Sequence, residues 1–427
     1  MLKLIGQIKS LYHFGLAWFG NIWFKKPSQK IFVIGVTGTK GKSTVTELIN
    51  AILETAGKRT AVSSSVRFKI DNESRPNSTG MSMPGRFFLQ KFLSEAVAKG
   101  CDYAIIEVTS QGILQHRNRF VDFDAALVTN LEPEHIEAHG SFENYRDSKV
   151  EFFRDVALHS GKSPKLFFIN SDARDYEFFS AAVADFGNPR TQRAERSSHD
   201  GKIILFNKKD MVKVKIKTKL IGDFNLENIA AAVAFARSQN IDWDTIRQAV
   251  ETFDGVPGRL EFVQKTPFSV VIDYAHTPDS LEKVYQTLKP KKLSGAKSAY
   301  GGQKLICVLG AAGGGRDMWK RPVMGEIAAK YCDSIILTNE DPFDEDPQEI
   351  IDEIESGIMN SGKKKVKKIL DRREAIRTAV RAAKKGDSVI ITGKGSEYSM
   401  RVANGKQIPW NEKEIVTKIL NGERIEA

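Results

Sequence analysis

A glycine-rich stretch, GVTGTKGKST at residues 35–44, carries the residue types from which phosphate sites are built. It follows a short apolar, β-branched run at 31–34 and precedes a segment with apolar residues on one helical face. In such a turn the backbone N–H groups and the positive end of the helix dipole bind phosphate. We therefore predict a loop for ATP or GTP, although five residues rather than four separate Gly35 from Gly41, unlike the strict P-loop pattern.

The side chains of this loop have distinct expected roles. Lys42 adds a positive charge for the phosphates, and Ser43 or Thr44 can offer a hydroxyl to Mg²⁺. The loop residues expected to bind the nucleotide are Gly38, Thr39, Lys40, Gly41, Lys42, Ser43 and Thr44.

Polar side chains also follow two further strand-like runs. Glu107 ends the run YAIIEV, while His135 and His139 lie in EPEHIEAHG after the run AALVTNL. Open α/β sheets bind ligands at the carboxyl ends of their strands, and Mg²⁺ prefers oxygen ligands. We predict Glu107 as a Mg²⁺ ligand and His135 as a metal or phosphate ligand. For His139 a purely structural role is the alternative.

The elements that must position these residues alternate between strand-like and helical patterns along the chain. This alternation predicts an α/β protein with parallel sheets flanked by helices. We expect a central P-loop-type ATPase domain at 29–255 and a smaller Rossmann-like C-terminal domain at 256–427, with the boundary inside the Gly- and Pro-containing segment 253–263.

Three shorter segments carry further predictions. The period-two pattern of 201–222 predicts a β-hairpin or a small antiparallel patch. Segment 289–304 has the composition of a mobile surface loop, and the basic run 363–368 that of a solvated helix end or loop.

The 427 residues carry a net charge of +11, and 41% of them are hydrophobic, as in ordinary globular proteins. The basic residues are dispersed, without zinc-finger spacing or a recognition helix, so we expect anionic small substrates rather than nucleic acid as partners. The cysteines Cys101, Cys307 and Cys332 are odd in number and form no C-x-x-C pair, which predicts reduced thiols in a cytoplasmic protein.

The N-terminal segment 1–28 is predicted to be helical, and residues 10–26 are rich in aromatics. They are too short and too polar to span a bilayer, and no signal-peptide cleavage site follows. Two interpretations stay open. The helix packs on the protein's own core, or it contacts a membrane surface or partner protein, with Lys25 and Lys26 at the lipid headgroups.

From residue 31 to the C-terminus, the order of short motifs resembles the Mur ligase family, above all its UDP-N-acetylmuramoyl-tripeptide synthetases. The matching motifs include GVTGTKGKST, EVTSQG, TNLEPEHIEAHGSFENYRDSK, IGDFNLENIAAA, GVPGRLE, VIDYAHTPDSL, GAAGGGRDMWKRPVM, NEDPFDEDP and GKGSE. The resemblance implies that ATP phosphorylates a substrate carboxylate and that an amino acid's amine attacks the acyl phosphate. An amide, ADP and phosphate result. The implied acceptor is a UDP-N-acetylmuramoyl-dipeptide or a similar carboxylate in cytoplasmic peptidoglycan synthesis.

The resemblance also implies roles for individual residues. Lys42 contacts the phosphates, Ser43 and Glu107 hold one Mg²⁺, and His135 helps to bind a second. Lys149 matches a carbamylated lysine that helps to hold that second ion. The resemblance also implies a catalytic role for Arg259, which would lie near the phosphates. Further nucleotide contacts are implied for Asn228, Asp273 and His276, and substrate contacts for Ser78, Thr79, Pro84, Thr109, Ser110, Arg117, Glu340, Asp341, Ser396 and Glu397.

The sequence departs from the family pattern at its specificity motifs. The motif DNPR of diaminopimelate-adding members reads EDPF at 340–343, so Phe343 replaces an arginine that would clamp a carboxylate. This argues against diaminopimelate and leaves Glu340 and Asp341 to suit a basic amine such as that of lysine. Ser396 replaces a histidine, and Gln111 another.

Only 34 residues precede Gly35, too few for the family's UDP-binding domain. We therefore expect the uridine to be held differently, a partner to supply the missing surface, or an acceptor without UDP. The alternatives are a ligase of the same superfamily with a folylpolyglutamate- or cyanophycin-type acceptor, or a non-catalytic, membrane-associated subunit.

Overall fold

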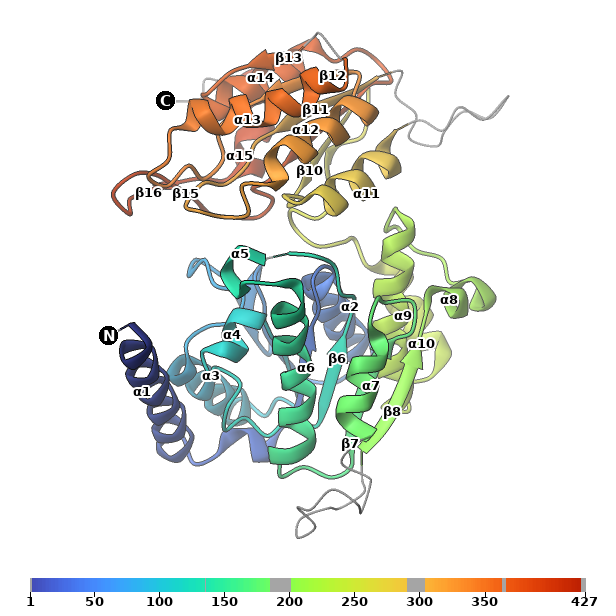
Figure 1. Ribbon diagram of the computed structural model, residues 1–427. Coiled ribbons are helices and arrows are strands. Elements are labelled where there is room, and N and C mark those ends of the chain that lie inside the picture. Colours follow the sequence, from blue (N-terminus) through green and yellow to red (C-terminus); the bar gives the residue numbers. More distant parts are fainter. Residues whose placement is uncertain (1, 135, 185–200, 290–303, 363–365, 424–427) are drawn as a thin grey trace. The chain divides into compact units, whose positions relative to one another are not determined.

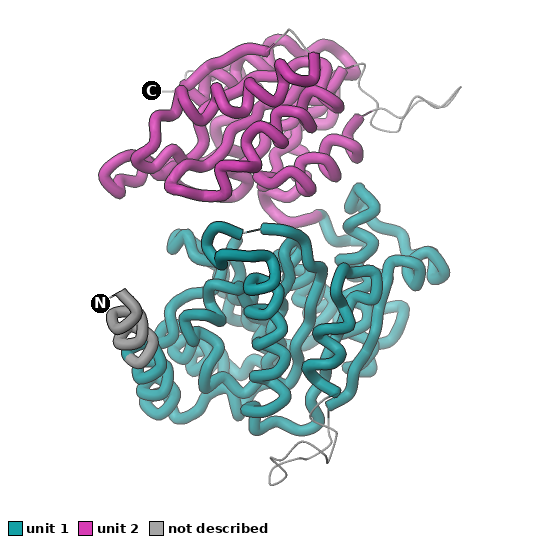
Figure 2. Tube along the Cα trace, in the orientation of Figure 1, with its two compact units in different colours: residues 1–254 teal, residues 255–427 magenta. Residues whose placement is uncertain are grey.

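The structure is a computed structural model that describes residues 2–134, 136–184, 201–289, 304–362 and 366–423 (Figure 1). The chain divides into two compact units, residues 1–254 and 255–427 (Figure 2). The division falls inside segment 253–263. No helix among the described residues is long and apolar enough to cross a membrane.

Unit 1 is built on an eight-stranded sheet with the strand order β4-β3-β2-β5-β1-β6-β7-β8. Its centre is β1 (Phe32–Thr37), which pairs in parallel with β5 (Tyr103–Glu107) and β6 (Ala125–Val128). The strands outside these three are β2 (Thr60–Ser63), β3 (Arg67–Ile70), β4 (Glu73–Pro76), β7 (Lys165–Asn170) and β8 (Gly201–Phe206). Only the pairs β2–β3 and β3–β4 are antiparallel, so the predicted parallel-dominated α/β sheet is confirmed.

Helices cover both faces of this sheet. Val33 packs into one buried apolar cluster with residues of α3 (Arg86–Ala98) and α6 (Phe142–His159). Ile34 packs into the other cluster, with α2 (Lys42–Thr55) and α9 (Asp223–Ser238). Successive strand residues point to opposite faces, which explains why the run 31–34 is continuously apolar. The remaining helices are α1 (Leu2–Trp23), η1 (Pro27–Lys30), α4 (Ser110–Leu114), α5 (Ile136–His139), α7 (Tyr176–Ala184), α8 (Lys208–Val214) and α10 (Trp243–Thr252).

The hairpin predicted at 201–222 is wrong. Residues 201–206 form β8, which pairs in parallel with β7 at the sheet edge, and residues 208–214 form the helix α8. The side chain of Asn207 accepts a hydrogen bond from the backbone N–H of Lys209 at 3.0 Å and so caps this helix. The alternating pattern reflects a half-exposed edge strand followed by a short helix.

Unit 2 contains a six-stranded sheet with the order β13-β12-β11-β14-β10-β9. Its strands are β9 (Glu261–Gln264), β10 (Ser269–Asp273), β11 (Leu305–Leu309), β12 (Ser334–Leu337), β13 (Val366–Lys368) and β14 (Ser388–Thr392), of which only β9 is antiparallel. A second small sheet pairs β15 (Ser399–Arg401) with β16 (Gln407–Pro409). The helices are α11 (Pro278–Leu288), α12 (Lys320–Tyr331), α13 (Pro347–Asn360), α14 (Arg372–Ala382) and α15 (Glu412–Leu420).

Two loop predictions fall in this unit. The basic run 363–368 is not wholly a loop, because residues 366–368 form β13 and extend the sheet beside β12. Its residues 363–365 lie outside the described residues, as do residues 290–303 of the predicted loop 289–304.

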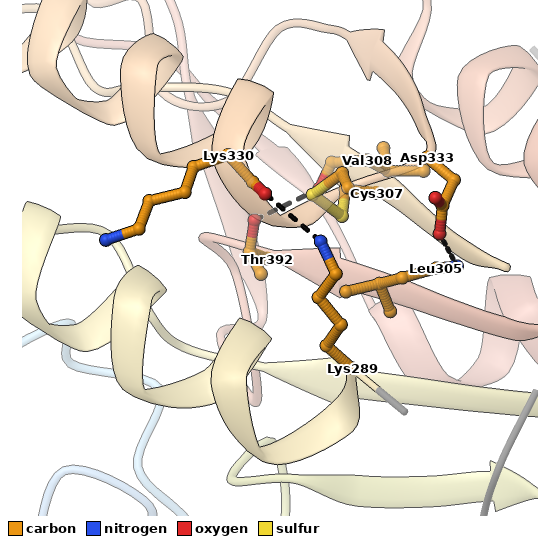
Figure 3. Close-up of a disulfide and its surroundings, with 8 residues drawn as sticks. Lys289, Leu305, Cys307, Val308, Lys330, Asp333 and Thr392 are labelled. Atoms are coloured by element: carbon orange, nitrogen blue, oxygen red, sulfur yellow. Dashed lines mark hydrogen bonds between the residues drawn. A yellow bond between two sulfur atoms is a disulfide. The ribbon is translucent and has the colours of Figure 1, made fainter. Parts of the chain in front are cut away.

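A disulfide joins Cys307 of β11 to Cys332, which directly follows α12 (Figure 3). The two Cα atoms are 6.0 Å apart, within the usual range for a disulfide. The prediction of reduced thiols is therefore wrong for these two cysteines, while Cys101 is free and buried. Sequence spacing gave no signal because 25 residues separate the partners and only the β11–β12 pairing brings them together.

The disulfide predicts how many thiols can be titrated before and after reduction. Protein purified in air and then denatured should titrate one thiol, that of Cys101, and three after reduction. Closing a loop of this length should stabilise the fold by about 3 kcal/mol, so Cys307→Ser/Cys332→Ser should lower the free energy of unfolding by that amount. Cys101→Ser is the control that removes the single free thiol. Three thiols without reduction would contradict the disulfide.

Candidate active site

The loop between β1 and α2 requires glycine at two positions. Gly38 has φ +136° and Gly41 has φ +82°, both outside the range that other residues adopt easily. A Cβ added at Gly38 would lie 2.0 Å from Thr129 Oγ1, and one at Gly41 would lie 2.2 Å from Asn228 Oδ1. The glycines therefore let the loop backbone approach β6 and α9 closely.

Hydrogen bonds from neighbouring elements fix this loop. Asn130 accepts from the backbone N–H of Thr39 through its carbonyl, at 3.0 Å, and from that of Lys40 through its side chain, at 2.9 Å. Thr129 Oγ1 donates to the carbonyl of Lys40 at 2.6 Å, and the Tyr145 hydroxyl donates to Thr39 Oγ1 at 3.0 Å. The loop is thus held in place before any ligand arrives.

Helix α2 begins directly after the loop, and its N-cap is Gly41, which offers no side-chain cap. The first N–H groups of a helix have no partner within the helix. With Lys42, Ser43 and Thr44 in that first turn, the loop forms an anion cradle that fits the phosphates of a nucleotide.

Two lysines meet at the loop. Lys42 Nζ donates to the carbonyls of Gly38 and Thr39, at 2.9 Å each. Lys149 Nζ, on α6, donates to the same Gly38 carbonyl at 2.9 Å and lies 4.6 Å from the centroid of the Tyr145 ring. Burial, and next the charge of Lys42, hold the pKa of Lys149 well below its usual range. This lysine therefore has an enhanced share of neutral, nucleophilic amine.

Oxygen ligands for a hard cation lie beside the loop. Ser43 Oγ is 2.8 Å from Ser65 Oγ, and the buried carboxylate of Glu107 accepts from the backbone N–H of Ser65 at 3.1 Å. The predicted pair Ser43 and Glu107 is thus linked through Ser65, which sequence reasoning missed. Hydroxyl and carboxylate oxygens fit Mg²⁺. Within the described residues, no three His, Cys, Asp or Glu side chains gather into a metal cluster.

The histidine predictions have different outcomes. His135 lies outside the described residues. His139 Nε2 is 3.1 Å from Ser110 Oγ, and its ring packs edge-on against Tyr145. Burial, and next the charge of Lys149, lower the pKa of His139. Glu134, which sequence reasoning missed, forms an ion pair with Lys40 at 2.7 Å.

Two segments of the predicted acceptor site lie side by side. The guanidinium of Arg117 donates to the carbonyl of Met83 and to the side chain of Gln115, while Arg86 donates to the carbonyl of Gln115. Burial lowers the pKa of Arg117, and burial followed by the charge of Arg117 lowers that of Arg86. This pair of half-buried guanidinium groups suits an anionic substrate, and Arg86 was not predicted.

Of the other predicted acceptor residues, Thr109 and Thr79 make local structural contacts. Thr109 caps α4 by accepting from the N–H of Gly112 at 3.0 Å. Thr79 Oγ1 donates to Asn77 Oδ1 at 2.6 Å. Pro84 is buried, and Ser78 is exposed.

Asn228 and the predicted nucleotide residues of unit 2 also support turns. Asn228 Oδ1 faces Gly41, and its Nδ2 donates to Asn225 at 2.9 Å. Asp273 accepts from two backbone N–H groups, those of Leu260 and Ala275, at 2.7 Å each. His276 Nδ1 is 2.7 Å from the carbonyl of Tyr274, and the Arg259 guanidinium lies 4.2 Å from the Tyr274 ring centroid.

A buried lysine organises the carboxylates of unit 2. Lys394 Nζ donates to Asp341 at 2.7 Å and to Glu397 at 2.5 Å. The Tyr274 hydroxyl donates to the same Glu397 at 3.0 Å, and the charge of Glu397, then burial, raises the pKa of Tyr274 well above its usual range. Ser396 lies beside Gly258, where an added Cβ would be 2.2 Å from the Ser396 nitrogen. Two predicted residues, Asp341 and Glu397, are therefore held by one residue that sequence reasoning missed, Lys394.

Glu340 and Phe343 line the neighbouring loop. Glu340 is buried, its Oε2 has no hydrogen-bond partner, and burial raises its pKa to about 7. The guanidinium groups of Arg316 and Arg401 lie 4.9 and 5.8 Å from the centroid of the Phe343 ring. Positive charge is therefore present at this loop even though position 343 carries none.

Comparison with known proteins places both units in one family. Residues 36–236 match the model of the Mur ligase middle domain, and residues 258–395 match that of the Mur ligase glutamate ligase domain. A UDP-N-acetylmuramoyl-L-alanyl-D-glutamate–2,6-diaminopimelate ligase of Aquifex aeolicus is 36% identical over 94% of this chain and 80% of its own length. A UDP-N-acetylmuramyl-tripeptide synthetase of Roseiflexus is 34% identical over 91% of this chain and 78% of its own length.

Solved structures share the fold. A UDP-N-acetylmuramoyl-L-alanyl-D-glutamate–2,6-diaminopimelate ligase has a TM-score of 0.57 at 28% identity, over 92% of this chain and 78% of its own. A folylpolyglutamate synthase of Mycobacterium tuberculosis, solved with ADP and AMPPCP, has a TM-score of 0.66 over 89% of this chain and 92% of its own. Its identity of 16% indicates similarity of fold alone.

The close approach of Gly41 to Asn228 predicts the effect of one added methyl group. Gly41→Ala should weaken nucleotide binding at least ~10-fold, because loop and α9 must move apart. Gly57→Ala is the matched control, since Gly57 also has positive φ, +73°, but open space around its Cβ position. Titration with a fluorescent ATP analogue checks both variants. Equal weakening in both, or none in Gly41→Ala, would contradict the arrangement of the loop.

Proposed function

Because the chain belongs to the Mur ligase family, we propose that it is an ATP-dependent, ADP-forming ligase that adds an amino acid to UDP-N-acetylmuramoyl-dipeptide. This step would supply the peptide of peptidoglycan in the cytoplasm. The observation that carries the proposal is the preformed phosphate loop, with two lysines on one carbonyl and the Ser43–Ser65–Glu107 chain beside it.

The reaction brings two anions together, so the protein must supply positive charge where they meet. An oxygen of the acceptor carboxylate attacks the γ-phosphorus, and ADP leaves. The amine nitrogen of the amino acid then attacks the acyl carbon, phosphate leaves, and the amine gives up a proton. In this proposal the loop N–H groups and Lys42 orient and neutralise the phosphates. Two Mg²⁺ ions, one held by Ser43 and Glu107 and a second bound with the help of His135, would supply further positive charge.

Carbamylation of Lys149 belongs to the same proposal. Only a neutral amine adds carbon dioxide, and the lowered pKa of Lys149 favours that form. The ammonium first loses a proton, and addition of carbon dioxide to the neutral amine then gives a carbamate and releases a second proton. Together these two steps replace a buried cation beside Lys42 with an anion, so repulsion becomes attraction. The carbamate would also offer oxygen atoms to a second Mg²⁺.

Lysine and diaminopimelate are the two candidates for the amino acid that is added. Phe343 argues against diaminopimelate on sequence grounds, yet Arg316 and Arg401 lie next to its ring and can receive a carboxylate. Asp341 is already paired with Lys394, so Glu340 is the carboxyl group left for an ammonium. We propose that Arg401 and Glu340 together decide this selectivity.

We also propose a cytoplasmic location and a contact outside the chain through residues 10–26. The thiol titration tests this location: three free thiols without reduction would support the cytosol, where disulfides are rare, whereas the Cys307–Cys332 disulfide would argue against it. A non-catalytic role is disfavoured, since Lys42, Glu107 and Lys149 are all present and positioned at the loop.

The function is tested by ADP release across a matrix of substrates. Acceptors are UDP-N-acetylmuramoyl-dipeptide, its UDP-free counterpart and a folate; amino acids are lysine, diaminopimelate, glutamate and neutral ones. We expect release only with the UDP-linked dipeptide plus lysine or diaminopimelate. If diaminopimelate is used, Arg401→Ala should raise its KM at least ~10-fold with kcat little changed. Turnover on a folate alone would refute the proposed acceptor.

Lys149→Ala tests the carbamate. Loss of a group that holds charge at the reacting centre should reduce kcat by ~10²–10³. Short carboxylates such as acetate should partly restore activity, and the wild type should lose activity in bicarbonate-free buffer. Lys162→Ala is the control, a half-buried lysine that pairs with Asp124 away from the loop. Full activity of Lys149→Ala would remove this residue from the mechanism.

A further inference from the structure

The helix α1 has an inverted distribution of side chains. Between residues 12 and 23 its exposed positions are all apolar or glycine: Tyr12, Phe14, Gly15, Trp18, Phe19, Ile22 and Trp23. Its more polar side chains, those of His13 and Asn21, are half-buried, and Asn21 Oδ1 has no hydrogen-bond partner. A helix whose outer side faces water normally carries polar residues on that side and apolar residues on the buried side.

The inner side of α1 is already occupied. Ala17 and Gly20 are buried, and a Cβ added at Gly20 would lie 3.3 Å from the ring of Phe87 on α3. Figure 1 shows α1 beside α3 at the margin of unit 1. Phe14 packs on Phe120 with ring centroids 4.9 Å apart. The helix is therefore docked on its own unit through one side and through Phe14, while Tyr12, Trp18, Ile22 and Trp23 on its aromatic side remain about half exposed or more.

The charges near α1 favour an anionic lipid surface as the partner of the aromatic side. The first acidic residue of the chain is Glu47, whereas lysines occur at positions 3, 9, 25, 26 and 30. Lys25 and Lys26 are exposed directly after the last turn of α1. Tryptophan and tyrosine favour the boundary between lipid chains and water, and lysines bind anionic headgroups. A protein partner would have to supply an apolar surface of matching shape. A bilayer supplies both an apolar region for the aromatic side chains and anionic headgroups for the lysines.

We propose that the exposed aromatic side of α1 binds the surface of an anionic lipid bilayer. The helix would lie in the plane of the interface with Trp18, Phe19 and Trp23 in the headgroup–acyl boundary. Lys25 and Lys26 would lie among the lipid phosphates. This surface is separate from the phosphate loop and does not depend on the proposed activity.

Vesicle sedimentation with the full chain tests the proposal. The wild type should pellet with phosphatidylcholine vesicles that contain about one-third phosphatidylglycerol, and binding should weaken as salt rises. Trp18→Ser/Trp23→Ser should weaken binding at least ~10-fold, because two large apolar side chains leave the interface. Lys25→Glu/Lys26→Glu should abolish the preference for anionic vesicles. Trp319→Ser is the matched control: Trp319 is 46% exposed, close to the 52% of Trp18, but lies in unit 2.

Nucleotide binding by each variant shows that unit 1 remains folded. Wild-type protein that stays in the supernatant with every vesicle type would overturn the proposal. So would an equal loss in Trp319→Ser, or equal binding to neutral and anionic vesicles. A concentration-dependent dimer that Trp18→Ser/Trp23→Ser abolishes, without vesicle binding, would assign the surface to a second copy instead and would also overturn it.

Discussion

Two lysine amines that share one carbonyl, the buried one of Lys149 and the half-buried one of Lys42, set the electrostatics of the phosphate loop. Lys42 and Lys149 both donate to the oxygen of Gly38, and the pKa of Lys149 is lowered as a result of burial and this proximity. Like charges this close repel strongly where water is scarce. An anion would relieve this repulsion, and the proposed nucleotide phosphates and the proposed carbamate on Lys149 are two such anions. In this proposal the same constraint links nucleotide binding to modification of the lysine.

The strand order of the sheet brings the residues around the phosphate loop together. β1 lies between β5 and β6, so the loop after β1 meets Glu107 on one side and the residues that follow β6 on the other. Asn130 and Thr129 hold the loop backbone, and Gly38 gives them room. In unit 2 the ammonium of Lys394 pairs with the carboxylates of Asp341 and Glu397, while Glu340 Oε2 has no hydrogen-bond partner.

Features carried by contiguous residues were predictable from the sequence. The phosphate loop, its strand and its helix occupy residues 31–55, and their periodicity and glycines fix them locally. The α/β class followed from the alternation of strand and helix patterns. Prediction from the period-two pattern alone failed at 201–222. There a half-exposed edge strand and a short capped helix together give the sequence pattern of a hairpin. There, pairing with β7 decided the outcome.

By itself, the sequence determined the phosphate loop, the family motifs and the aromatic composition of the N-terminal segment, because each is written in neighbouring residues. Tertiary structure alone decided which distant residues complete them. Ser65 reaches Ser43 and Glu107, Arg86 reaches Arg117, and Cys307 reaches Cys332 only through strand order and helix packing. It also decided that the aromatic side of α1 is exposed. Composition does not specify this, since burial depends on which side of a helix finds a neighbour.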